Sequence, residues 1–247
     1  MAFTNSKSAS ENAHYYDEQW SRLTPEPGGE QEKARIRAIC QALEDFGNPK
    51  DNKLILDLGC GRGWMTPYLS KYGKVYGVDF SEVGIQFAQA HFSDLGTFIL
   101  ANSQEPTLGL GDLTFDIVVS SEVVEHVPSQ EDYIRLILDL LNPQGHCILT
   151  TPNGNLWSKY SKESRFKNHL QPVENWLTPA KFRSLIVKAG LKYLRHEGIP
   201  IHKLRLGRLR WMQHKYIQYW VEKFNLGRVY GKIVLPHALY QIIVARK

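Results

Sequence analysis

The stretch Leu56–Trp64, which reads LDLGCGRGW, restricts the fold of this chain more than any other. The apolar run Lys53–Leu56 before it is typical of a buried parallel strand. Residues 64–71 after it suit a helix, because Pro67 falls in the first turn, where its missing N–H costs little. The glycines between strand and helix let the backbone turn tightly and approach a ligand. Free N–H groups at the helix start suit a carboxylate or a phosphate.

The spacing of the three glycines distinguishes between possible ligands. A dinucleotide fingerprint requires G-x-G-x-x-G, and Trp64 stands where its third glycine would fall. A P-loop ends in Gly-Lys-Ser/Thr, which this stretch lacks. The pattern D-x-G-x-G-x-G, from Asp57 to Gly63, resembles the first motif of the class I S-adenosylmethionine (SAM)-dependent methyltransferases. The alternative interpretation is an ordinary glycine-rich turn between a strand and a helix.

Strands and helices are expected to alternate after this unit. Apolar runs predict the strands, and N-cap residues such as Ser81 open the helices. Alternation over residues 53–151 indicates a doubly wound, mostly parallel sheet of the Rossmann-like α/β class. The resemblance implies seven strands, an antiparallel last strand and a helical insertion before it. The expected strands are residues 53–56, 74–79, 97–101, 115–121, 146–151, 191–197 and 238–245, and the expected helices are residues 30–46, 64–71, 81–93, 129–141 and 178–190.

The second strand ends in Asp79, which lies 16 residues past Gly63. A carboxylate at this strand end can accept hydrogen bonds from both hydroxyls of a ribose, and its alternative role is that of a helix N-cap. The resemblance implies cofactor contacts from the glycine loop, from the strand ends and from an aromatic N-terminal lid. These expected contacts are Tyr16, Asp57, Gly59, Cys60, Gly61, Gly63, Trp64, Asp79, Phe80, Asn102, Ser103, Ser121 and Glu122.

A second motif runs from Phe115 to Val127 and reads FD-x-V-x-x-x-x-V-x-E-H-V. It resembles small-molecule O- and N-methyltransferases related to those of ubiquinone biosynthesis. An amine acceptor needs only its neutral form, whereas a phenol or hydroxyl gains from a nearby base. Helix capping and walling of the cofactor pocket are the alternative roles for these side chains. The catalytic candidates are His126, His169 and Glu125.

Metal chemistry is not expected to be required. Thr151-Pro152-Asn153 stands after the fifth strand, where metal-dependent catechol-type relatives carry an Asp-Asp/Asn pair. The acceptor is expected to contact two segments in which the resemblance is weakest, residues 153–176 and 201–236, although each side chain there could equally belong to a surface loop. The candidate substrate contacts are Asn153, Trp157, Tyr160, His169 and Trp211.

Residues 201–236 mix cations with aromatic side chains. Such a stretch can cap a substrate pocket, hold a partner subunit, or rest on an acidic surface such as a membrane or RNA. A substrate cap or a dimer contact is favoured, because no RNA-binding module accompanies the stretch. Nucleic acid is therefore not an expected partner, and the protein is expected to be a monomer or a homodimer.

Length and composition fit one methyltransferase domain over residues 1–247, with N-terminal lid helices at 14–46. The sequence has no run long enough to span a bilayer and no signal peptide. Its three cysteines cannot all pair and do not have the spacing of a metal site. These features predict a reducing, cytoplasmic location. The expected reaction moves a methyl group from SAM to an oxygen or nitrogen of a small molecule and leaves S-adenosylhomocysteine. The alternatives are a methyltransferase acting on RNA or protein, or a non-catalytic SAM-binding protein; the failed dinucleotide fingerprint disfavours an oxidoreductase.

Overall fold

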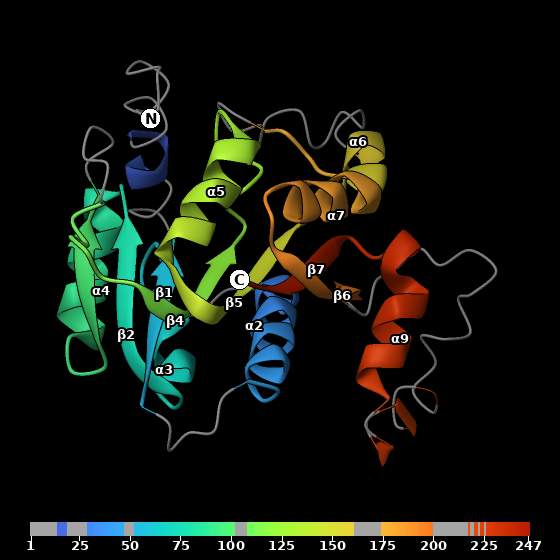
Figure 1. Ribbon diagram of the computed structural model, residues 1–247, viewed down its shortest axis with the longest axis horizontal. Helices are drawn as coiled ribbons and strands as arrows, with labels where there is room; N and C mark the ends of the chain where they lie inside the picture. The colour runs from blue at the N-terminus through green and yellow to red at the C-terminus, as the bar shows by residue number, and fades with distance from the viewer. Residues whose placement is uncertain are drawn as a thin grey trace.

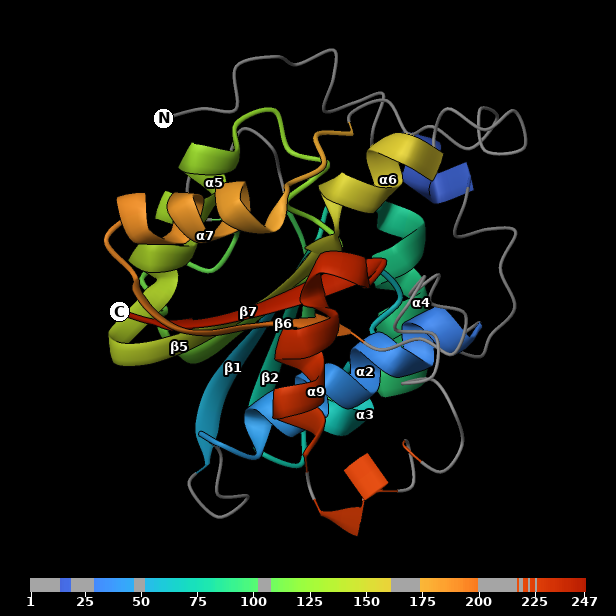
Figure 2. The same cartoon turned by 90° about the vertical axis from the view of Figure 1, so that its right-hand side faces the viewer.

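The computed structural model describes residues 14–18, 29–46, 52–101, 108–160, 174–199, 217, 220–221, 223–224 and 226–247. Within these residues one seven-stranded sheet has the order β3-β2-β1-β4-β5-β7-β6. Helices cover both of its faces (Figures 1 and 2). The strands are β1 (Lys53–Leu58), β2 (Gly73–Asp79), β3 (Gly96–Leu100), β4 (Phe115–Ser121), β5 (Leu141–Pro152), β6 (Lys192–Ile199) and β7 (Tyr240–Arg246).

The helices connect these strands in the expected alternation. Residues 14–18 form a short helical segment before them. The N-caps Ser81, Ser129 and Thr178 each accept a hydrogen bond from a backbone N–H three residues later, which confirms where these helices begin. The helices are α2 (Glu30–Leu43), α3 (Thr66–Leu69), α4 (Glu82–Phe92), α5 (Gln130–Leu140), α6 (Gly154–Tyr160), α7 (Pro179–Lys188) and α9 (Gly227–Val234), followed by the 3₁₀ turn η3 (Leu235–His237).

Strand directions confirm the doubly wound, mostly parallel sheet. The five strands β1 to β5 run parallel, whereas β7 is antiparallel to both of its neighbours, β5 and β6. The strand order reverses between β1 and β4, so the crevice at their carboxyl ends is the expected ligand position in such a sheet.

Alternate residues of the central strands supply two separate cores. Leu56 and Ile243 pack with α5 and α7 on one face, whereas Ile55 and Ile242 pack with α2 and α3 on the other. Figure 2 shows α5 and α7 on one side of the sheet and α2, α3 and α9 on the other. Because both faces are covered, the strands read as nearly continuous apolar runs.

Three expected boundaries are wrong. The helix expected at 64–71 is reduced to α3, because Trp64 and Met65 remain in turns. The strand expected from His146 begins earlier, since Leu141 already pairs with Phe115 before a register shift. The segment after Pro152 was expected to be irregular, but its first part forms α6.

The described residues include no helix that is both long and apolar enough to cross a membrane.

Candidate functional site

The loop between β1 and α3 has a backbone that glycine adopts readily and other residues rarely do. The φ angles of Gly59, Gly61 and Gly63 are +83°, +51° and +73°. A Cβ at Gly59 would collide with Val123, so the loop lies directly against the segment that follows β4. The amides of Gly59 and Cys60 both donate to the Val78 carbonyl, which fixes the loop on β2. The D-x-G-x-G-x-G pattern is therefore a tight turn at the crevice between β1 and β4.

Asp79 holds this loop from the end of β2. Its Oδ2 accepts a hydrogen bond from Gly61 N at 2.7 Å, and its Oδ1 accepts one from Ser81 N at 2.8 Å. Burial raises the pKa of the carboxyl, and the backbone hydrogen bonds oppose that rise. Each carboxylate oxygen can accept a further hydrogen bond. Asp79 is thus held in place while it can still accept hydrogen bonds from ligand hydroxyls.

Asp57 lies buried at the end of β1, beneath the glycine loop. Its Oδ2 has no hydrogen-bond partner among the residues that the structure describes. Burial, and then the proximity of Asp79, raises the pKa of the Asp57 carboxyl to about 7. A buried acceptor left unsatisfied costs about 1–3 kcal/mol. A bound ligand that offers a cation or a hydrogen-bond donor at this point would recover that cost, so the site fits SAM, whose methionine portion carries an ammonium group.

The short helical segment of residues 14–18 lies over the ends of β2 and β4. The Tyr16 ring stands edge-on to Phe80 at 5.6 Å and to His126 at 6.2 Å between ring centroids. Asp17 Oδ1 accepts hydrogen bonds from Ser81 Oγ and, at 3.2 Å, from Val83 N. These contacts place Tyr16, the residue expected in the lid, between Phe80 after β2 and His126 after β4.

Glu122 follows β4 directly and has a strained backbone conformation. Its φ of +60° is rare outside glycine, and such strain is typical of functional sites. Its Oε1 accepts from Thr150 Oγ1 at 3.0 Å, and its Oε2 lies 4.0 Å from Arg35 Nη1. Burial raises the pKa of Glu122, whereas Arg35 and Thr150 lower it. The carboxylate is therefore held between β5 and α2, and Arg35 partly neutralises its charge.

Glu125 and His126 follow on the same loop. The Oε2 of Glu125 accepts from Thr151 Oγ1 at 2.9 Å, and its Oε1 lies 3.6 Å from His126 Nε2. Burial, and then the charge of Glu122, raises the pKa of Glu125 well above its ordinary value. The raised pKa makes the ionised form of Glu125 less favourable, while its carboxyl lies within reach of the His126 imidazole. Of these two candidate bases, the burial of Glu125 favours His126.

The sequence analysis did not predict Arg35, whose guanidinium lies beside Glu122. Arg35 comes from α2, and its guanidinium lies 4.9 Å from the centroid of the Tyr240 ring as well as beside Glu122. The Tyr240 hydroxyl donates to Gln31 Oε1 at 2.9 Å, so α2 and β7 share one polar contact network. The sequence signal for Arg35 was slight: it lies four residues before the buried Ile39, on the inner face of an amphipathic helix.

Asn153 does not face an acceptor, contrary to expectation. It is fully buried, and its Nδ2 donates to the carbonyls of Leu235 and Ala238 at 2.9 and 3.0 Å. Its Oδ1 accepts from Asn155 N at 3.1 Å. Every hydrogen-bonding atom of the side chain is engaged by backbone, so Asn153 joins the end of β5 to the segment before β7.

Trp157 also has a packing role. Its Nε1 donates to the Leu239 carbonyl at 3.0 Å, and its ring lies 6.0 Å from that of Tyr240 and 6.2 Å from that of Trp176. It remains partly exposed. Trp157 therefore packs α6 against both Tyr240 and Trp176.

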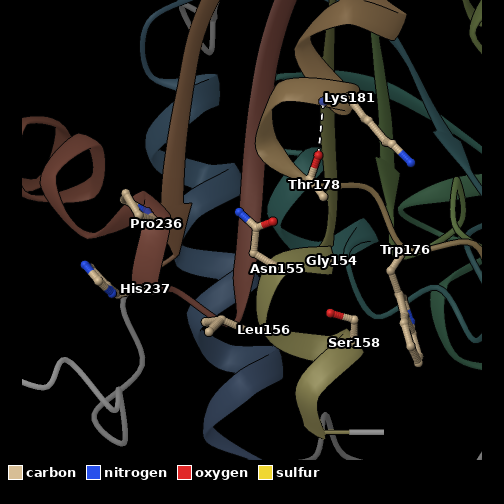
Figure 3. Close-up of a pocket in the computed structure, with 9 residues that line it drawn as sticks. All are labelled: Gly154, Asn155, Leu156, Ser158, Trp176, Thr178, Lys181, Pro236 and His237. Atoms are coloured by element: carbon tan, nitrogen blue, oxygen red, sulfur yellow. Dashed lines mark hydrogen bonds between the residues drawn. The ribbon is translucent and has the colours of Figure 1, made fainter.

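A cavity of about 680 Å³ lies between the starts of α6 and α7 and the turn η3 (Figure 3). Asn175, next to the cavity residue Trp176, donates its backbone N–H to the Glu125 carbonyl at 2.8 Å. One cavity residue, Trp176, is therefore next in sequence to a residue that is bonded to the Glu125 loop. It is lined by Gly154, Asn155, Leu156, Ser158, Trp176, Thr178, Lys181, Pro236 and His237.

Of the remaining expected residues, some lie in the part of the chain that the structure describes and others lie outside it. Ser121 Oγ lies 2.9 Å from Thr150 Oγ1 at the end of β4, Cys60 is buried in the loop, and Trp64 lies 5.5 Å from the Arg62 guanidinium. Tyr160 ends α6, and its side chain is not described. The other four fall outside the described residues: Asn102, Ser103, His169 and Trp211.

The sheet order and the glycine loop together define an α/β protein with a nucleoside-type crevice at the β1–β4 switch point. Residues 31–226 match the family described as a methyltransferase domain, which is most of the chain. This protein therefore belongs to the methyltransferase family, as its two motifs predict.

Two similar proteins are ubiquinone biosynthesis O-methyltransferases. The mitochondrial enzyme of Rattus norvegicus is 31% identical over 189 residues, which are 71% of this chain and 54% of the relative. That of Vibrio campbellii is 32% identical over 170 residues, which are 63% of this chain and 72% of the relative. The chain spans about half the length of the mammalian relatives that it matches.

Solved structures share the fold at low identity. The magnesium protoporphyrin IX methyltransferase from Synechocystis PCC 6803, solved with bound SAM, aligns with a TM-score of 0.61 at 16% identity, covering 99% of this chain and 100% of that one. A SAM-dependent methyltransferase from Mesorhizobium loti aligns with a TM-score of 0.59 at 19% identity, covering 86% and 100%. This level of similarity concerns the fold.

Proposed function

We propose that this protein transfers a methyl group from SAM to an oxygen of a small-molecule acceptor in a biosynthetic pathway, leaving S-adenosylhomocysteine. The observation that carries the proposal is the Asp79 carboxylate, fixed by Gly61 N and Ser81 N at the mouth of the crevice beside the unsatisfied Asp57. Oxygen is favoured over nitrogen because the curated relatives described above are named O-methyltransferases.

The residues of the chain bind and orient the cofactor. Asp79 would accept hydrogen bonds from the ribose hydroxyls of SAM, Asp57 would offer its unsatisfied carboxyl to the methionine portion, and Tyr16 with Phe80 would help to exclude water. SAM supplies a methyl carbon that is already electrophilic, so alignment of the acceptor oxygen is the main task of the protein. Alignment of this kind lowers a barrier by several kcal/mol, roughly 7–11 at best.

The acceptor hydroxyl must lose a proton as it attacks. His126 is the proposed base, and Glu125 positions its imidazole from 3.6 Å. Glu122, held by Thr150 and Arg35, forms the adjacent wall of the crevice. The body of the acceptor occupies the cavity between α6, α7 and η3, where Trp176 offers a ring and Asn155, Ser158 and Lys181 offer polar contacts.

The decisive experiment is isothermal titration of the purified protein with SAM and S-adenosylhomocysteine, with NAD as the control. Binding of the first two ligands but not of NAD supports the cofactor assignment, whereas a preference for NAD overturns it. Incubation of cell extract with methyl-labelled SAM then separates low-mass acceptors from RNA or protein acceptors. Label found only in macromolecules would support the alternative substrate class instead.

A matched pair of variants tests the base. His126→Gln should lower kcat for a hydroxyl acceptor with little change in SAM affinity, while the exposed His91→Gln on α4 should change neither. We expect treatment with EDTA to leave the rate unchanged, since no metal requirement is proposed; restoration of a lost rate by Mg²⁺ would contradict that expectation.

A reducing compartment, the cytoplasm, is part of the proposal, because Cys40, Cys60 and Cys147 are all free thiols. Four of the similar proteins are named as mitochondrial. Imaging of a tagged chain in its own cell decides between these locations. The monomer or homodimer expected from the sequence is checked by light scattering.

A further inference from the structure

The first turn of α4 is capped from two distant places in the chain. Ser81 Oγ accepts a hydrogen bond from Gly84 N at 3.1 Å, as an ordinary N-cap does. Val83 N instead donates to Asp17 Oδ1 at 3.2 Å. The first amides of a helix have no partner within the helix. Residues 14–18, called here the 14–18 segment, therefore supply the acceptor for one amide of α4.

Ser81 connects Asp17 to the carboxylate that is proposed to bind ribose. Its hydroxyl donates to Asp17 Oδ1, and its backbone N–H donates to Asp79 Oδ1 at 2.8 Å. Ser81 is fully buried, so water does not compete for these contacts. Asp17, Ser81 and Asp79 thus form one continuous hydrogen-bonded network.

The charge of Asp17 acts in two ways. A carboxylate at the N-terminus of α4 is favourable, because the helix dipole is positive there. Asp17 also lies near Asp79: burial is the main cause that raises the pKa of Asp79, backbone hydrogen bonds oppose it, and the charge of Asp17 raises it further. Ligand hydroxyls that donate to Asp79 would weaken the repulsion between these two carboxylates. Ligand binding and the Asp17 contact should therefore favour each other.

The residue before Asp17 reaches the other side of the crevice. Tyr16 contacts Phe80 after β2 and His126 after β4, with ring centroids 5.6 and 6.2 Å away. Figure 1 shows the 14–18 segment, in dark blue, at the end of the sheet toward which β2 points. Asp17 thus fixes on α4 a segment whose next side chain touches both walls of the crevice.

We propose that Asp17 is a positioning residue, which latches the 14–18 segment to α4 and thereby sets the affinity for SAM. The inference rests on the proposed function and names a residue that controls its cofactor site. In the latched state Tyr16 lies between Phe80 and His126, and Asp79 is oriented by the turn of α4 that also binds Asp17. Apparent affinity falls with the fraction of molecules in the binding-competent state. The latch acts equally on S-adenosylhomocysteine, which carries the same ribose.

Calorimetry and stopped-flow fluorescence on the full chain test the latch. Asp17→Ala removes the acceptor of two hydrogen bonds, so the Kd for SAM and for S-adenosylhomocysteine should rise by about tenfold, and SAM should dissociate faster. Asp17→Asn keeps an acceptor oxygen, so its Kd should stay within about threefold of that of the unaltered protein. A residue that served only the stability of α4 would not change the dissociation rate in this graded way.

A matched control lies on α4 itself. Glu82 is an exposed acid in the first turn of the same helix, and its Oε1 accepts from Gln86 Nε2 at 3.1 Å. Glu82→Ala removes a charge from this helix end without touching Asp17, so the Kd for SAM should not change. Urea unfolding of each variant reports separately whether the fold has been weakened.

A double variant identifies the path of the coupling. Asp17→Ala and Ser81→Ala remove the two ends of one hydrogen bond. Together they should weaken SAM binding by less than the product of their separate effects, because the shared contact can be lost only once. Effects that simply multiply would mean that Asp17 does not act through Ser81.

The inference is overturned by an unchanged Kd and dissociation rate in Asp17→Ala, by an equal loss of affinity in Glu82→Ala, or by multiplying effects in the double variant. An absence of SAM binding by the unaltered chain would overturn the proposed function itself. That titration is made first, so the two failures are distinguishable.

Discussion

The Asp79 carboxylate has two tasks at once. It accepts hydrogen bonds from the amides of Gly61 and Ser81, and in the proposed function its oxygens also accept hydrogen bonds from the ligand. The residue therefore shapes the glycine loop before a ligand arrives, and the ligand does not have to order it. Preorganisation of this kind raises affinity because less conformational freedom is lost on binding.

Replacement of this carboxylate should remove most of the cofactor affinity. Asp79→Ala deletes two charge-assisted contacts to ligand hydroxyls, each worth about 1.5–3 kcal/mol, so the Kd for SAM should rise by roughly a hundredfold or more. The Kd for SAM of Asp79→Asn should lie between that of the unaltered protein and that of Asp79→Ala. Calorimetry measures the Kd, with Glu82→Ala as a control on the exposed side of α4. An unchanged Kd in Asp79→Ala would show that the site has been placed wrongly.

The pair Arg35 and Glu122 joins α2 to the end of β4. Arg35→Met should leave the Glu122 carboxylate without its neighbouring cation and lower the free energy of unfolding by about 1–3 kcal/mol. The double variant Arg35→Met with Glu122→Gln should recover part of that loss, because no charge then remains uncompensated. Urea unfolding of the single and double variants measures the coupling. Additive losses would mean that the 4.0 Å contact contributes nothing to stability.

At the scale of elements, the sequence predicted best the features that depend on neighbouring residues in the chain. The strands of the core, the N-caps Ser81 and Thr178 and the glycine loop all depend on residues within a few positions of one another. The contacts of Arg35, Asp17 and Asn153 join segments 64 or more residues apart, and no local pattern reports such pairs. Asn153 was misplaced for this reason: a polar residue after a strand looks exposed until the segment that covers it is known.

Asn153 should matter for stability and little for cofactor binding. Asn153→Ala leaves the carbonyls of Leu235 and Ala238 without a donor, which should cost about 2–4 kcal/mol of unfolding free energy. The exposed Asn155→Ala, two residues further on in α6, serves as the comparison and should cost far less. Chemical denaturation and SAM titration are the two measurements. A stable Asn153→Ala with weakened acceptor binding would restore the role expected from the sequence.

At the scale of the whole molecule, the carboxyl edge of the sheet gathers buried acids. Burial is the main cause that raises the pKa of Asp57, Asp79, Glu122 and Glu125. An acid whose pKa is raised by folding binds more protons in the native state than in the unfolded state. The contribution of these acids to stability without a ligand therefore falls as the pH rises, and for Asp57 the fall spans the interval between its ordinary pKa and about 7. The buried His196, whose pKa burial lowers to about 4, contributes in the opposite direction.

Urea unfolding across this pH interval checks the sign. Asp57→Asn removes the contribution of Asp57 and leaves the other titrating groups, including His196, in place. The free energy of unfolding of Asp57→Asn minus that of the unaltered ligand-free protein should therefore rise between mild acid and pH 7, by an amount on the order of a few kcal/mol. A difference that stays constant or falls over this interval would contradict the assignment.

The position of β7 also sets the order in which the sheet can be completed during synthesis. The ribosome makes β6 before β7, yet β6 reaches the sheet only by pairing with β7, which itself pairs with β5. Until residues 240–246 have emerged, β5 stays an open edge and Lys192–Ile199 has no strand to join. Growth of the chain and growth of the sheet thus run in different orders, and β6 and β7 must be added together in the last step of assembly.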